Sequence, residues 1–139
     1  MTTHSLMQVV TDLITHLDAG TLQEGFLEPL ERGSARGHVG VIRDPSEPAQ
    51  LLLIVRMEVM RVPATARDAF HQELLSLNHG LLGRASFSVG DDGRVFLSAG
   101  RPVEDLDPSE VVDLLLWTSQ QADRFDDLLI QAFPPPDAR

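Results

Sequence analysis

Apolar residues recur along the chain with two different periods, which divide it into helices and strands. Spacings of three and four predict a first helix over residues 5–20, with Ser5 and Gln8 placed as a capping box. The same period returns over residues 65–82, where Thr65 has the residue type and position of an N-cap. These two segments are therefore expected to be amphipathic helices.

A third helix has the clearest start in the sequence. Asp107 is a capping residue, Pro108 follows at the first helical position, and Glu110 lies three residues after the cap. Apolar residues with helical period then continue until the prolines at 134–136. We expect a long amphipathic helix that packs one stripe against a core.

The remaining apolar residues alternate with polar ones, which is typical of strands. Strands are predicted over residues 25–32, where Pro29 indicates an edge strand, and over residues 38–43 and 50–62. Residues 85–99 form a hairpin pattern around the turn Gly90-Asp91-Asp92-Gly93, because Asp-Gly supplies the backbone angles that short turns need. Five strands are thus expected, in two groups.

The longest predicted strand supplies the candidate binding residues. Its odd positions are apolar and predict a core face, whereas its even positions are apolar at both ends and charged in the middle. Phe96, which lies between two inward-facing positions, is expected on the same outward face. The candidate protein-binding residues are Ile54, Arg56, Met60 and Phe96. A plain solvent face, edge packing or a covering loop would also explain these positions.

The order of the predicted elements gives the fold class. The chain is an α+β protein in which an antiparallel sheet of about five strands and three helices follow the order α-β-β-β-α-β-β-α. A length of 139 residues fits a single domain that spans residues 1–139. The edges and the apolar face of such an open sheet can accept a segment of another chain.

Composition limits the partners and the chemistry. The formal charge of −10 disfavours direct binding to nucleic acid, although a local group of arginines would override the average. All 11 basic side chains are arginine, so lysine chemistry such as a Schiff base is excluded, and the absence of cysteine excludes disulfides and thiolate sites. No secretory signal and no membrane-spanning run is recognised, so we expect a cytoplasmic protein.

No group of residues has the spacing of a catalytic or metal site. The five histidines lack the His-Glu-x-x-His pattern, and nucleophile motifs such as Gly-x-Ser-x-Gly are missing. Asp123, Asp126 and Asp127 have a spacing that can hold a cation, but a solvated helix face explains them better. We therefore expect no catalytic residue, no metal and no cofactor.

Several short segments of the C-terminal half form a recognisable pattern. They are Leu74-Leu75-Ser76-Leu77-Asn78, Gly83 before Phe87, Asp92-Gly93-Arg94-Val95-Phe96-Leu97, Arg101-Pro102-Val103, and Leu106 before Asp107-Pro108-Ser109-Glu110. These segments resemble the type III secretion chaperone fold and the related YbjN-like proteins, whereas the first sixty residues agree in the order of elements alone.

The resemblance implies a function that the residues alone do not disclose. Proteins of this kind are small, acidic and commonly dimeric, and they hold an extended segment of another protein over sheet and helix surfaces. We therefore predict a non-catalytic adaptor or chaperone-like module that acts as a homodimer and binds another protein. The alternatives are a regulatory domain that senses a small molecule and an enzyme with a dispersed site.

Overall fold

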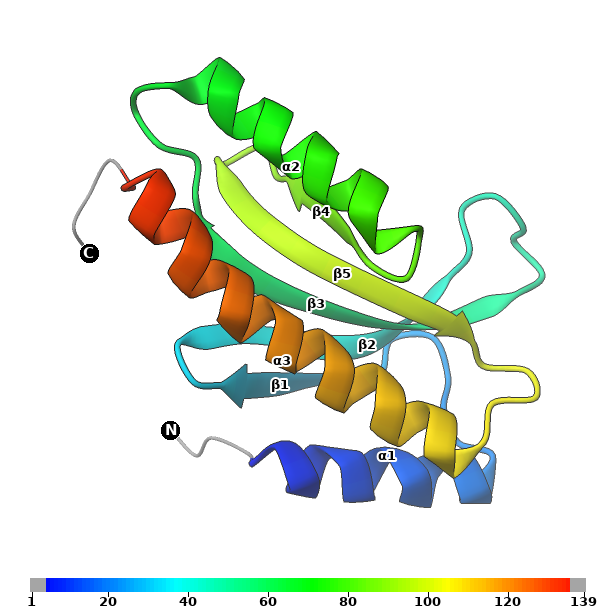
Figure 1. Cartoon of the computed structure of the whole chain (residues 1–139). Helices are drawn as coiled ribbons and strands as arrows, with labels where there is room; N and C mark the ends of the chain where they lie inside the picture. Colours follow the sequence, from blue (N-terminus) through cyan, green and yellow to red (C-terminus); the bar gives the residue numbers. More distant parts are fainter. Residues whose placement is uncertain (1–4, 136–139) are drawn as a thin grey trace.

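The computed structural model describes residues 5–135 and confirms the predicted α+β class and order of elements. Within these residues the chain forms three helices and five strands in the order α-β-β-β-α-β-β-α (Figure 1). They are α1 (Leu6–Ala19), β1 (Leu27–Arg32), β2 (Ala35–Arg43), β3 (Leu51–Arg61), α2 (Arg67–Leu81), β4 (Ser86–Val89), β5 (Arg94–Pro102) and α3 (Pro108–Ala132).

The five strands form one antiparallel sheet in the order β1-β2-β3-β5-β4. The longest strand, β3, lies at the centre, as expected for the most apolar segment of the chain. β1 and β4 are the two edge strands, so the edge position predicted from Pro29 is confirmed. Residues that pair across neighbouring strands present their side chains on the same side of the sheet.

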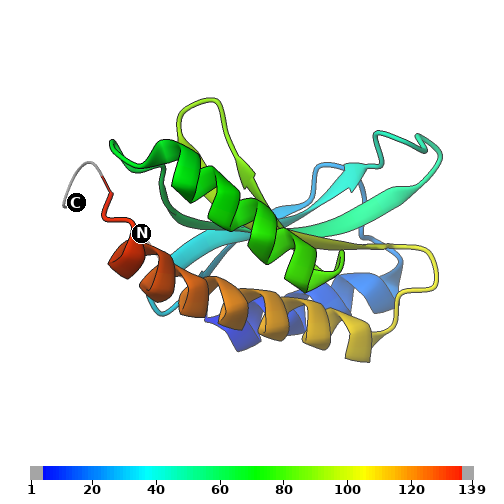
Figure 2. The same ribbon diagram turned by 45° about the horizontal axis from the view of Figure 1, so that its top comes forward.

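All three helices pack on one face of the sheet. Figure 1 shows α2 and α3 crossing in front of the strands, and Figure 2 shows α1 beside α3 on the same side. The side chains beneath them come from odd positions of β3 and β5, and Leu53, Val55, Met57 and Leu97 are completely buried there. Among residues 5–135 no helix covers the opposite face, and it is the surface on which the candidate residues were expected.

The caps of α1 and α3 are as predicted. Ser5 accepts a hydrogen bond from the backbone N–H of Gln8. Asp107 accepts one from the N–H of Glu110, at 2.9 Å, while the Glu110 carboxylate accepts one from the N–H of Asp107, at 3.1 Å. These reciprocal bonds satisfy two of the N–H groups that a helix start leaves free.

The cap of α3 gives a pH-dependent prediction. Hydrogen bonds from the Ser109 hydroxyl and the Glu110 N–H lower the pKa of Asp107 below its ordinary value. A lowered pKa in the folded state stabilises the protein above the unfolded value, near pH 4, and this contribution is lost as the pH falls through the folded pKa. Asp107→Ala is therefore expected to lower the urea midpoint at pH 7, by an amount that shrinks under acid conditions.

Asp91→Asn, which removes the same charge from an exposed hairpin turn, is the matched control and should leave the urea midpoint unchanged. If Asp107→Ala lowered the midpoint equally at pH 7 and at pH 2.5, the lost contribution would not come from the ionised cap.

The start of α2 differs from the prediction. Thr65 is not its N-cap, because the cap is Ala66, which has a left-handed backbone with φ of 54° and makes no side-chain cap bond. Leu82 caps the other end in the same left-handed region, with φ of 55°, so the helix ends at Leu81, one residue before the end of the predicted range 65–82. The turns at both ends of α2 are thus set by the packing of the helix, since neither residue favours such angles.

Candidate functional site

The face of the sheet that carries no helix is called the open face below. In β2, β4 and β5 its side chains are those at even-numbered positions, and in β1 they are those at odd-numbered positions. In β3 they are the even-numbered side chains from Leu52 to Glu58, followed by Arg61. This assignment follows from the cross-strand pairs, because partners share a face. Of the predicted binding residues, Ile54, Arg56 and Phe96 lie on the open face, where Arg56 is next to Ile54 along β3 and lies over the Phe96 ring.

One end of the open face is an apolar platform. Leu27 is 65% exposed and Ile42 is 41% exposed, while Leu52 and Ile54 are half-buried. Leu27 pairs with Gly40, and Ile54 pairs with Gly100, so each aliphatic side chain lies opposite a residue that has none. A Cβ at Gly100 would lie 2.4 Å from Cδ1 of Ile54, which means that this side chain fills the space above the glycine. The platform consequently consists of aliphatic side chains that extend over neighbouring glycines.

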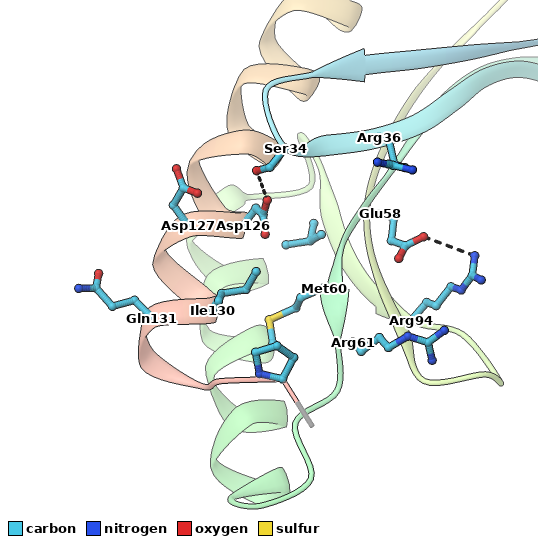
Figure 3. A pocket seen from close by; sticks show the side chains of 12 residues that line it. Ser34, Arg36, Glu58, Met60, Arg61, Arg94, Asp126, Asp127, Ile130 and Gln131 are labelled. Atoms are coloured by element: carbon cyan, nitrogen blue, oxygen red, sulfur yellow. Dashed lines mark hydrogen bonds and ion pairs between the residues drawn. The ribbon is translucent and has the colours of Figure 1, made fainter. Parts of the chain in front are cut away.

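The other end of the open face carries arginines. The Arg56 guanidinium lies 5.8 Å from the centre of the Phe96 ring, within the range of a cation–π contact, and its Nε is 3.4 Å from Oγ of Ser98. Arg94 pairs with Glu58 at 3.4 Å and with Asp92 at 3.1 Å. Figure 3 shows the Glu58–Arg94 pair, with Arg36 nearby.

Met60 is not on the open face, so the expected grouping with Ile54 and Phe96 is wrong for this residue. A β-bulge between Glu58 and Met60 shifts the register, and Met60 pairs with Val95 on the helix side. Its side chain is 5% exposed and points toward Ile130 of α3 (Figure 3). An extra residue in a strand reverses the alternation of all later side chains, which is why the even position is buried.

A groove of about 800 Å³ lies where β3 continues beyond the first residues of β2. Arg36, Arg61 and Arg94 line it from the open face, and Asp126 and Asp127 line it from α3 (Figure 3). The groove thus carries opposite charges on its two sides. It begins at the arginine end of the open face, and the two surfaces are continuous.

The acidic cluster on α3 is not wholly a solvated face, as the sequence had suggested. Asp126 is 4% exposed and accepts a hydrogen bond from the Ser34 hydroxyl, while Asp123 accepts one from the Ser34 N–H at 3.2 Å. Both carboxylates therefore hold the turn between β1 and β2 against the helix. Asp127 alone is exposed. Among residues 5–135 no group of three or more His, Asp or Glu side chains is arranged to hold a metal ion.

Both edges of the sheet have features that oppose strand addition. On β4, the Asn78 side chain accepts a hydrogen bond from the Phe87 N–H at 2.6 Å and donates one to the Phe87 carbonyl at 3.2 Å. On β1, Pro29 has no N–H to donate. Such devices protect edge strands from pairing with other chains. The open face is therefore a better binding surface than either edge.

Sequence reasoning did not select Arg36, Arg61 or Arg94. The alternation that placed Phe96 outward also places Arg94 outward, and this signal was available in the sequence. Arg36 precedes the predicted strand over residues 38–43, and it joins the outward residues because β2 begins three residues earlier, at Ala35. The outward position of Arg61 could not be predicted in this way, because it depends on the bulge in β3. In the part of the chain that is described, no helix is long and apolar enough to span a bilayer.

Comparison with known proteins gives one family, and several chains of solved structures also match. The YbjN family model, described as "Putative bacterial sensory transduction regulator", matches residues 9–131. A chain of the ExsC-ExsE complex is 16% identical with a TM-score of 0.62, and the match covers 89% of this chain and 95% of that one. No curated protein matches the chain.

The second solved structure is the heterodimeric ExoU-SpcU complex from the type III secretion system of Pseudomonas aeruginosa. It is 19% identical to this chain with a TM-score of 0.53, and the match covers 88% of this chain and 98% of that one. At such identities the likeness of both structures concerns the fold. The predicted resemblance to YbjN-like proteins and to the type III secretion chaperone fold is confirmed.

Proposed function

The chain belongs to the YbjN family, and on this premise we propose that it is a non-catalytic adaptor or chaperone-like module that binds a segment of another protein. The observation that carries the proposal is the open face, where Leu27 and Ile42 stay exposed beside Leu52 and Ile54. Contiguous apolar surface of this kind is typical of interaction sites. The complexes ExsC-ExsE and ExoU-SpcU, which share the fold, support a protein partner.

Binding to the open face can be tested by affinity capture from the native cell with the full chain as bait. We expect a stoichiometric partner that is lost with Ile54→Asp, because the new carboxylate lies in the apolar platform. Leu27→Asp is a second variant with little risk to folding, since Leu27 is 65% exposed. Leu128→Asp, at a 49% exposed position of α3, is the matched control and should retain the partner.

Two results would contradict the proposed adaptor function. One is the absence of any stoichiometric partner, and the other is a partner that Ile54→Asp and Leu27→Asp retain as well as the parent does. Circular dichroism of each variant identifies a loss of binding that is caused by unfolding.

The same proposal includes a homodimer in the cytoplasm. Leu75 and Leu82 lie seven residues apart at the outer side and end of α2, and they are 64% and 86% exposed. Large aliphatic side chains that stay exposed in this way can pack against a second copy. We expect light scattering to give twice the chain mass of 15.3 kDa, and Leu75→Asp to give the monomer. A parent protein that is monomeric at micromolar concentration would contradict the proposed dimer.

A regulatory domain that senses a small molecule is the second candidate. The groove beside Arg36, Arg61 and Arg94 is the observation that favours it, because its volume suits a small anionic ligand. Thermal shift against a panel of metabolites separates the two functions. Strong stabilisation by one metabolite would support sensing, since a ligand that binds only the folded state raises its stability.

A further inference from the structure

We propose that the open face selects a partner segment that is both aliphatic and acidic. Its aliphatic side chains would lie on the platform around Leu27 and Ile54, and its carboxylates would pair with Arg36, Arg56 and Arg61. This inference rests on the proposed function and adds the chemistry of the partner to it.

The first argument is the distribution of charge. The open face carries four arginines, at positions 36, 56, 61 and 94, against two carboxylates, Glu31 and Glu58, which gives a formal charge of +2. The whole chain has a formal charge of −10. The open face is therefore a cationic region on an acidic protein, and an acidic segment is attracted to it and repelled by the remaining surface.

The second argument is that most of these arginines have no carboxylate partner in the part of the chain that the structure describes. Arg94 pairs with Glu58 and Asp92, whereas Arg36, Arg56 and Arg61 form no ion pair there. Arg36 lies opposite Glu58 of β3 and Glu31 of β1 in the register, yet Glu58 is engaged by Arg94, and no ion pair joins Arg36 to Glu31 within residues 5–135. Three guanidinium groups are thus available, each with the planar geometry that binds a carboxylate through two hydrogen bonds.

The third argument is the arrangement of the two ends. Ile54 and Arg61 belong to the same strand and lie seven residues apart, which is about 23 Å at roughly 3.3 Å per residue. Phe96, half-buried beneath Arg56, joins them. A segment that crosses the face must therefore place its aliphatic residues and its carboxylates at separate positions along its length.

A polypeptide fits this face better than a nucleic acid does. The exposed side chains of Leu27 and Ile42 can pack against aliphatic side chains but cannot donate hydrogen bonds to a phosphate backbone. The total charge of the chain also repels a long polyanion. Single-stranded DNA is therefore included in the test as a competing ligand.

The test uses the full chain and a library of random twelve-residue peptides displayed on phage. We expect the selected peptides to be enriched in Asp and Glu, with aliphatic residues at a separate position. A labelled peptide from this selection should bind the double variant Arg36→Glu/Arg61→Glu about tenfold more weakly than the parent, and added NaCl should weaken its binding to the parent.

The matched control is Arg67→Glu/Arg124→Glu, which makes the same change of charge at exposed positions away from the open face. It should bind the peptide as the parent does. Thermal melting of both double variants checks that they are folded.

Different failures have different meanings. Selected peptides without acidic enrichment, or acidic peptides that bind Arg36→Glu/Arg61→Glu as tightly as the parent, would overturn the inference and leave the adaptor intact. If the full chain retained no peptide from the library, that result would overturn the proposed adaptor function as well.

Two further results would assign the open face to another occupant and overturn the inference. One is tighter binding of single-stranded DNA than of any selected peptide, abolished by Arg36→Glu/Arg61→Glu. The other is dissociation of a dimer by the same variant, which would assign the face to a second copy of the chain.

Discussion

Replacing Gly37 by alanine is expected to lower the free energy of unfolding by about 3 kcal/mol, because β2 and β3 approach too closely there for a side chain. Gly37 pairs with Met57 of β3. A Cβ at position 37 would lie 2.0 Å from the carbonyl oxygen of Arg56 and 2.7 Å from Cα of Met57. Both atoms belong to the backbone of the central strand, so they cannot move aside without disturbing the ladder of hydrogen bonds.

Urea unfolding of the variant and the parent measures this loss, and Gly80→Ala is the matched control. Gly80 lies within α2, and a Cβ there would meet nothing within 4 Å. Since alanine favours a helix over glycine, the control should gain about 0.5 to 1 kcal/mol. A Gly37→Ala protein as stable as the parent would mean that β2 and β3 are separated further in solution than in the structure.

The parts of the fold that could be predicted are those set by neighbouring residues. Asp107 and Glu110 satisfy each other's backbone within one turn, and Gly93 takes the left-handed angle, φ of 81°, that the hairpin turn requires. Strand alternation correctly placed Ile54, Arg56 and Phe96 on one face. These signals depend on residues close together in the chain, so they can be recognised in the sequence alone.

What could not be predicted depends on residues far apart in the chain. Alternation cannot locate a bulge, so Met60 was assigned to the wrong face and Arg61 was not selected. Asp126 was interpreted as a solvated residue because its partner, Ser34, is 92 positions away in the sequence. Neither error changes the fold class, but together they hid the groove and the full set of arginines on the open face.

Replacing Asn78 by alanine is expected to destabilise the protein by about 2 kcal/mol, the second largest effect, and also to change how it associates. The Asn78 side chain makes two hydrogen bonds to the backbone of Phe87, where a further strand would otherwise pair with β4. Alanine removes both bonds and leaves the N–H and carbonyl of a partly buried residue without partners. The edge of β4 then becomes available to another chain.

Two measurements therefore separate stability from edge protection in Asn78→Ala. Urea unfolding should show the loss of stability, and sedimentation velocity should show larger species whose fraction rises with protein concentration. Gln72→Ala, at an exposed position of the same helix, controls for the loss of a side-chain amide and should change neither property. If Asn78→Ala lost stability without associating, then α2, which packs against β4, would be enough to shield the edge. The role of Asn78 would in that case be confined to holding α2 against β4.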